Sequence, residues 1–168
     1  LGIRTQRSTL ATPALELPMG GAIQSLVAGN RHVCSRIFDS ANSRTTNSCW
    51  GRNFESQVDG LPQATDAHVM YAVPAVSNFV SSFIAAGGGN SCDIRALNAV
   101  NGKRMTCWGE NGLRQLGTAN AAFFFDNDVP MPSTQTWVGA ATNGGTTCGL
   151  LRDDAAPIPA NAVQAECW

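Results

Sequence analysis

The sequence predicts an all-β protein made of three antiparallel repeat units of about 57 residues each, every unit closed by its own disulfide bond. Three observations lead to this prediction. Charged residues are scarce while glycine is abundant, six cysteines fall into three similarly spaced pairs, and the residues around each pair recur in the same order. Together these features favour short strands joined by tight turns over helices.

The composition argues against several classes of function. Only 14% of the 168 residues are charged and the formal net charge is −1, so we expect no nucleic-acid partner, which would require a basic face. No run of about 18 apolar residues is present, so we expect no membrane span. No basic-then-apolar leader precedes the first repeat, and we expect a mature chain from which a signal peptide has been removed.

The spacing of the cysteines selects one disulfide pairing. Six cysteines allow 15 pairings, but 14, 14 and 18 residues separate successive partners, and equivalent pairs should form equivalent bonds. Across a hairpin, the two Cα atoms of each bond should lie about 5.5 Å apart. The absence of a C-x-x-C pair lowers the case for zinc or redox chemistry, and the density of disulfides indicates an oxidising, extracellular location. The predicted bonds are Cys34–Cys49, Cys92–Cys107 and Cys148–Cys167.

A second repeated feature is the block C-W-G-x-N-x-x-x-Q, which begins at each second cysteine. It runs from Cys49 to Gln57 and from Cys107 to Gln115, and a third copy starts at Cys167. Aromatic residues at one phase of every repeat indicate packing in the core rather than a ligand platform. The residues that we expect to form this repeat core are Trp50, Trp108, Trp168, Gly51, Gly109, Asn53 and Asn111.

Each repeat contains the same series of elements. It begins with an apolar residue and a proline, which suit an edge strand because proline has no N–H to donate. A short apolar run then predicts a buried strand, a glycine-rich turn reverses the chain, and two strands that carry the cysteines follow. The apolar–proline steps are Leu17-Pro18, Val73-Pro74 and Val129-Pro130, and the buried strands are 23–28, 79–86 and 137–141. These anchors divide the chain into repeats at 1–58, 59–116 and 117–168, the last one incomplete.

The pattern A-G-x-x-H-x-C followed by C-W-G-x-N-x-x-x-Q-L-G resembles the regulator of chromosome condensation repeat family over nearly the whole chain. The resemblance implies a β-propeller in which each repeat of about 50 residues forms one four-stranded blade. Some positions depart from the pattern: Ser56 and Arg114 replace the glycine before the glutamine, and one Leu-Gly is Val58-Asp59. The histidine is kept only at His32, which we expect to hydrogen-bond the backbone of its turn.

Three blades alone do not close a propeller, since natural ones use four to eight. We therefore expect an open set of propeller-type blades, or a set that neighbouring chains complete. The chain opens on Leu1-Gly2 and stops at Trp168, which belong to the same repeated block. Three alternatives remain open: part of a longer chain, a ring of several chains, or a head-to-tail assembly through unpaired edges.

No set of residues predicts catalysis, so we expect a protein that is not an enzyme and that binds no cofactor or metal. His32 and His68 are the only histidines, and no G-x-S-x-G elbow accompanies them. The carboxylates are scattered rather than paired as in glycoside hydrolases. Asp126 and Asp128 are spaced like the start of a calcium loop, but its glycine and closing glutamate are missing, so a turn is the better interpretation.

The sequence also contains two kinds of candidate surface segment. The most apolar local run is Phe123, Phe124 and Phe125, which is either an exposed contact patch or a plug between blades. Segments 7–13 and 130–136 are rich in Ser, Thr and Pro, and we interpret them as solvated loops, with O-linked glycan as the alternative.

The expected function is that of a non-enzymatic extracellular structural protein whose copies associate through the edges of their β repeats, as a filament or an oligomer. The alternative is a protein-binding or inhibitor module within a longer β-propeller. Guanine-nucleotide exchange and chromatin binding, which nuclear members of the resembled family carry out, do not fit a disulfide-bonded chain with a net charge of −1.

Overall fold

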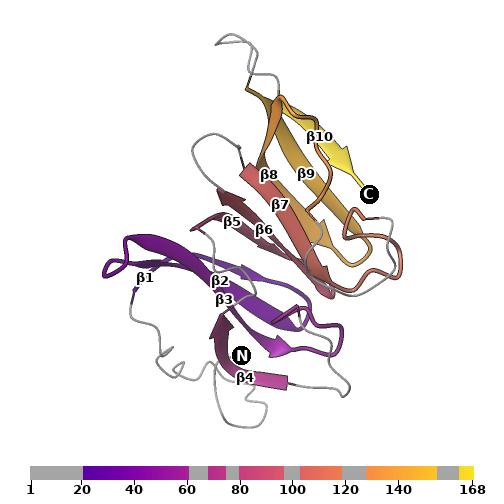
Figure 1. The fold of residues 1–168 in the computed structure, drawn as a ribbon. Helices are drawn as coiled ribbons and strands as arrows, with labels where there is room; N and C mark the ends of the chain where they lie inside the picture. Colours follow the sequence, from indigo (N-terminus) through magenta and orange to yellow (C-terminus); the bar gives the residue numbers. More distant parts are fainter. Residues whose placement is uncertain (1–20, 61–67, 75–79, 97–102, 119–127, 155–162) are drawn as a thin grey trace.

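The computed structural model describes residues 21–60, 68–74, 80–96, 103–118, 128–154 and 163–168, and in these residues the chain forms ten strands. The strands build three separate antiparallel sheets, which confirms the predicted all-β fold of propeller-type blades. Figure 1 shows the second sheet lying between the other two. The described part of the chain contains no helix that is able to span a membrane.

Strands that follow one another in the chain are neighbours in each sheet. The first sheet has the order β1-β2-β3-β4, the second β5-β6-β7 and the third β10-β9-β8. The strand bounds in the first sheet are β1 Ala22–Ala28, β2 His32–Asp39, β3 Arg44–Arg52 and β4 His68–Pro74; in the second, β5 Val80–Ala86, β6 Asn90–Ala96 and β7 Lys103–Gly109; and in the third, β8 Gln135–Asn143, β9 Thr146–Asp153 and β10 Val163–Cys167.

The glycine-rich turns close the first hairpin of the first two sheets in the same way. The Gly29 N–H donates to the His32 carbonyl, and the Gly87 N–H donates to the Asn90 carbonyl, both at 2.9 Å. The two turns also touch, since the Asn30 N–H donates to the Gly87 carbonyl at 2.9 Å. A Cβ on Gly29 would lie 2.2 Å from that same oxygen, so the close approach of two turns requires glycine here.

The first strand of each sheet carries a register shift at the equivalent position, for which the sequence gives no signal. A β-bulge of this kind bends its strand and increases the local twist. Repetition of the shift gives all three sheets the same local distortion on their first strand, which in the second and third sheets packs against the preceding sheet. The shifts lie between Ile23 and Ser25, between Ser81 and Phe83, and between Trp137 and Gly139.

The disulfide bonds join the two cysteine-bearing strands of each sheet, in the pairing that the repeat predicts. The Cα atoms of each pair lie 4.1 Å apart, so the predicted separation of about 5.5 Å is wrong. The longer distance belongs to hydrogen-bonded pairs of an antiparallel ladder, whereas cysteines occupy the closer, non-hydrogen-bonded positions, from which backbone groups point away from the partner strand. The bonds are Cys34–Cys49, Cys92–Cys107 and Cys148–Cys167.

The described apolar–proline steps pair with the sheet that precedes them in the chain. β4 ends at Val73-Pro74 and pairs with β3, with Val73 opposite Cys49. The Val129 N–H likewise donates to the Met105 carbonyl of β7 at 2.8 Å. The steps therefore lie on outer edges, where proline is tolerated, and the sheets are offset from the three repeats of the sequence. Leu17-Pro18 lies outside the described residues.

The sheets pack face to face through their first strands. β5 packs on β1, β2 and β3, and β8 packs on β5, β6 and β7. An apolar cluster fills each of the two junctions and buries the disulfide bond of the earlier sheet, so each of these bonds faces the sheet that follows. The first cluster contains Cys34, Cys49, Val58, Ile84 and Trp108; the second contains Ala85, Cys92, Ile94, Met105, Cys107, Leu116, Val129, Trp137 and Leu151.

A glycine-to-alanine pair tests the backbone conformation of the repeated block. Gly109 has a φ of 103°, and a Cβ there would lie 2.4 Å from the Gly89 carbonyl oxygen. Gly109→Ala should lower the free energy of unfolding by roughly 2 kcal/mol or more, measured by urea denaturation without reductant. The control is Gly112→Ala, because a Cβ on Gly112 meets nothing within 4 Å, and it should change stability by less than about 0.5 kcal/mol. Equal losses in both variants contradict the prediction.

Candidate interaction surface

The C-W-G-x-N-x-x-x-Q block folds into a loop that its own side chains hold. Asn111 Oδ1 accepts a hydrogen bond from the Leu116 N–H at 3.0 Å, and Gln115 Oε1 accepts one from the Leu113 N–H at 2.8 Å. Amide side chains suit these positions because they accept from backbone N–H groups without burying a charge. The first copy repeats both contacts, from the Val58 N–H to Asn53 Oδ1 at 2.9 Å and from the Glu55 N–H to Gln57 Oε1 at 3.0 Å.

The residue before each glutamine has a left-handed backbone. The φ angle is 61° at Ser56 and 65° at Arg114. These are the positions at which the resembled family pattern has glycine, and the positive φ supplies the physical reason for that preference. A residue with a Cβ costs about 1 kcal/mol in this conformation, so the hydrogen bonds within the loop offset local strain.

The loop presents the backbone carbonyl of its glutamine to the next sheet. Trp108 Nε1 donates to the Gln57 carbonyl at 3.1 Å, and Trp168 Nε1 donates to the Gln115 carbonyl at 3.0 Å. Each of these tryptophans therefore binds the loop of the preceding repeat. Trp50 and Trp108 are buried and Trp168 is half-buried. The recurring tryptophan and glutamine of the block thus supply the donor and the acceptor of one hydrogen bond between neighbouring sheets.

His32 belongs to the same junction. The prediction that its side chain hydrogen-bonds the backbone at the turn is wrong, because its partner is a side chain. Its Nε2 lies 2.8 Å from Ser91 Oγ, and that hydroxyl donates to the Gln57 carbonyl at 2.9 Å. Ser91 Oγ must therefore accept from His32, which assigns the proton to Nε2. Burial lowers the pKa of His32 to about 4. Asn90 takes the equivalent place at the next junction, where its Nδ2 donates to Thr147 Oγ1 at 3.0 Å.

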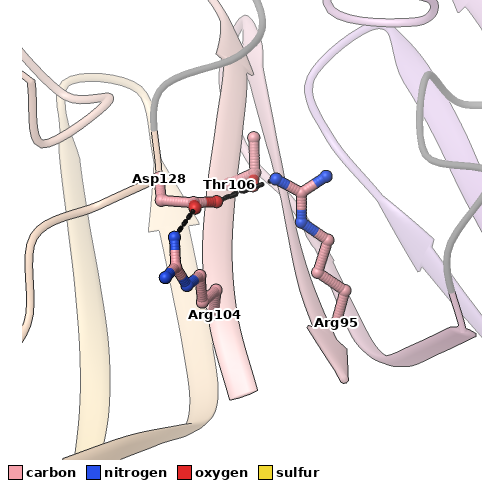
Figure 2. A network of polar contacts seen from close by, with 4 residues as sticks. All are labelled: Arg95, Arg104, Thr106 and Asp128. Atoms are coloured by element: carbon pink, nitrogen blue, oxygen red, sulfur yellow. Dashed lines mark hydrogen bonds and ion pairs between the residues drawn. The ribbon is translucent and has the colours of Figure 1, made fainter. Parts of the chain in front are cut away.

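Asp128 joins the outer segment of the second sheet to strands β6 and β7 through its contacts with Arg95, Arg104 and Thr106 (Figure 2). Its carboxylate oxygens lie 2.8 Å from Arg95 Nη2 and 2.7 Å from Arg104 Nη1, and Thr106 Oγ1 donates to it at 3.0 Å. Burial raises the pKa of Asp128, but the hydrogen bonds from Arg104, Arg95 and Thr106 outweigh this effect and hold the pKa below its usual value. Asp126, its partner in the rejected calcium loop, lies outside the described residues.

The third sheet exposes the face that the first two sheets bury. Leu150 is 42% exposed, whereas Ile94, two residues after the equivalent cysteine of the second sheet, is 0% exposed. Ala165 is exposed, and its counterpart Met105 is buried. Cys167 is also exposed, although the disulfide bonds of the other sheets are buried. Among the described strands none packs on this face, which we call the open face and define by Cys148, Leu150, Arg152, Val163, Ala165 and Cys167.

The described residues contain no group of three or more His, Cys, Asp or Glu side chains that is able to hold a metal ion. A shallow hollow of about 340 Å³ beside Trp168 is lined by one carboxylate, that of Glu166, and by no histidine or serine. The predicted contact patch, Phe123, Phe124 and Phe125, lies outside the described residues.

A double-mutant cycle tests the junction at the Gln57 carbonyl, which accepts from both Trp108 and Ser91. Trp108→Phe should lower the free energy of unfolding by about 1–2 kcal/mol, and Ser91→Ala by at least as much, because each leaves one donor to the carbonyl in place while Ser91→Ala also removes the acceptor of His32 Nε2–H. The double variant should lose about 1 kcal/mol more than the sum, since the buried carbonyl then has neither donor. Additive losses, measured by urea denaturation, contradict a shared acceptor.

The buried His32 predicts a loss of stability in acid. The pKa of His32 is about 4 in the folded chain and 6.5 in the reference state, so the unfolded chain binds more protons between these values. Its contribution is complete above pH 6.5 and falls by up to about 3 kcal/mol as the pH drops towards 4. His32→Asn, which introduces the residue that Asn90 supplies at the equivalent position, should flatten this part of the stability curve. A curve unchanged by this substitution contradicts the assignment.

Comparisons with known proteins support the fold alone. No family model matches the chain, and no curated protein sequence matches it. Among solved structures, human WBSCR16 matches with a TM-score of 0.57 and 13% identity, over 88% of this chain and 42% of that one. Yeast RCC1 (Prp20) bound to Kap60 matches with a TM-score of 0.54 and 13% identity, over 77% of this chain and 31% of that one.

A second structure of Prp20p, from Saccharomyces cerevisiae, gives the same TM-score of 0.54 and 13% identity, over 79% of this chain and 30% of that one. This chain therefore spans less than half the length of each of these matched proteins. The chain has the repeat fold of RCC1-type β-propellers, as an open set of blades.

Proposed function

We propose that this chain is a non-enzymatic extracellular protein that binds further copies of itself through the third sheet and so serves a structural role. The observation that carries the proposal is the open face. Residues equivalent to the buried contacts of the second sheet are exposed on the third, although both sheets have the same strand order and disulfide. A surface that is largely apolar and repeats a buried interface is suited to a similar partner.

The chemistry of the open face supports association with protein. Leu150 and Val163 are 42% and 55% exposed, and they lie beside a disulfide and an alanine. The one charged side chain among the paired positions of this face is Arg152, opposite Val163, and it forms an ion pair with Asp154 at 2.7 Å. Removing these apolar atoms from water on contact is favourable. The net charge of −1 adds little repulsion between copies. The three disulfide bonds support an oxidising, extracellular setting.

Light scattering on the full chain tests self-association. The wild-type mass should rise with concentration above the 17.6 kDa of one chain. Leu150→Glu should weaken association by at least about tenfold, because the contact would bury an unpaired charge. The matched control is Leu113→Glu, since Leu113 is 71% exposed and lies outside the open face. A wild-type mass that stays at one chain at all concentrations overturns the proposal.

A second candidate is a protein-binding module within a longer β-propeller. The observation in its favour is coverage, because the chain spans only 30–42% of the matched propellers. The yeast protein among them is bound to Kap60 in one structure and has binding properties towards Gsp1p and histones, so this fold is able to present surfaces to proteins. In that case the open face is covered by a fourth blade of the same chain. The intact mass of the protein isolated from its source distinguishes the two candidates.

A further inference from the structure

The outer edge of β10 is an unfilled position in the repeated architecture. β10 is equivalent to β3 and β7, because all three carry the second cysteine of their sheet. β3 is bordered by β4, and β7 is bordered by Asp128, which bridges Thr106. Within the described residues no segment pairs with the outer edge of β10, and all five of its residues are exposed.

The cysteine register shows which backbone groups this edge offers. Trp168 and Thr147 exchange two hydrogen bonds of 2.9 Å, so Trp168 directs its backbone groups towards β9. The neighbouring pair, Cys167 and Cys148, has its Cα atoms 4.1 Å apart and is non-hydrogen-bonded. The N–H and C=O of Cys167, and by alternation those of Ala165, therefore point away from β9. A strand laid along β10 would find these groups ready to pair.

The two filled edges show what kind of segment fits. Both take an apolar–proline step: Val73-Pro74 lies against β3 and Val129 lies against β7. Proline suits the outer side because it has no N–H to leave unpaired. Val129 is only 5% exposed and belongs to the cluster between the second and third sheets. The apolar residue of the step thus adds side-chain burial to the backbone pairing.

The sequence contains a third step of this kind, Leu17-Pro18-Met19. The two described steps follow the strand that they border, whereas this one precedes the first sheet. We propose that Leu17-Pro18-Met19 of a second copy pairs with the outer edge of β10 and completes the third sheet as its fourth strand. This inference rests on the proposed self-association and names the segment and the edge that carry it.

The two filled edges also indicate the register. In the first sheet, Val73 lies opposite Cys49. In the second sheet, the bridge of Asp128 to Thr106 places Val129 opposite Met105, two residues before the equivalent cysteine, Cys107. Transferred to β10, the second register would place Glu16 opposite Glu166, and like charges directly opposite destabilise a sheet. The first register places Leu17 opposite Cys167 and avoids this pair. We therefore assign the register of the first sheet.

One donor segment and one acceptor edge per chain make the contact heterologous, so copies join head to tail. Two variants separate the partners. Ala165→Pro blocks the edge by removing an outward N–H that makes no bond to β9, and Leu17→Asp disables the donor. Each variant alone should have the mass of one chain, 17.6 kDa. Their equimolar mixture should give a complex of twice that mass and no larger one, because only one pairing remains.

The control for the edge is Ala165→Ser, which keeps the N–H and should associate like the wild type. A second measurement uses a peptide of residues 11–20 added to the Leu17→Asp chain. Hydrogen exchange should then slow in β10, and this readout does not require the proline variant to fold. No protection of β10, or a mixture that contains only single chains, overturns the inference.

The outcomes also separate this inference from the proposed function. If Leu150→Glu disperses the wild-type assembly while Ala165→Pro and Leu17→Asp leave it intact, copies associate through the open face and the strand-donor inference is wrong. If the peptide protects β10 while the wild type stays at the mass of one chain, the edge accepts the step but self-association is wrong. In that case the donor belongs to the same chain, which overturns the inference of a second copy.

Discussion

The hydrogen bond from a tryptophan indole to the glutamine carbonyl of the preceding repeat is the interaction on which the arrangement of the sheets depends. It occurs at both junctions, from Trp108 to Gln57 and from Trp168 to Gln115. The carbonyl is available only because the loop before it is held by side-chain amides and by a residue with positive φ. The recurring motif therefore encodes a contact between repeats, in addition to the structure of one repeat.

Two kinds of constraint act at different ranges. Disulfide bonds and glycine-rich turns fix each hairpin locally, since they join residues that are close in the chain. The polar chain from His32 through Ser91 to Gln57 acts over a longer range and orients one sheet on the next. Asn90 replaces the buried histidine at the second junction, where it donates to Thr147 Oγ1 and accepts from Thr142 Oγ1. The Thr147 hydroxyl donates to Thr142 Oγ1, so the polar contacts of the two junctions differ and the second contains no group that titrates.

The open face and the unpaired outer edge of β10 arise for the same reason. In each of the first two sheets, the next sheet covers the disulfide and a later apolar–proline step borders the last cysteine-bearing strand. In the described residues the third sheet has neither, and it exposes Leu150, Val163 and the backbone groups of β10. Both features are suited to protein contact, the face through apolar burial and the edge through backbone pairing.

The sequence by itself determined the local features: the all-β class, the hairpins around the three cysteine pairs, and the repeated positions of tryptophan, glycine and asparagine. Each of these depends on residues that are near one another in the chain. Tertiary structure decided the rest, namely the partner of His32, the role of Asp128, the sheet to which each apolar–proline step belongs, and the exposure of the third sheet. The physical reason is that these features are contacts between separate sheets, and one residue pattern is compatible with several pairings until the sheets pack.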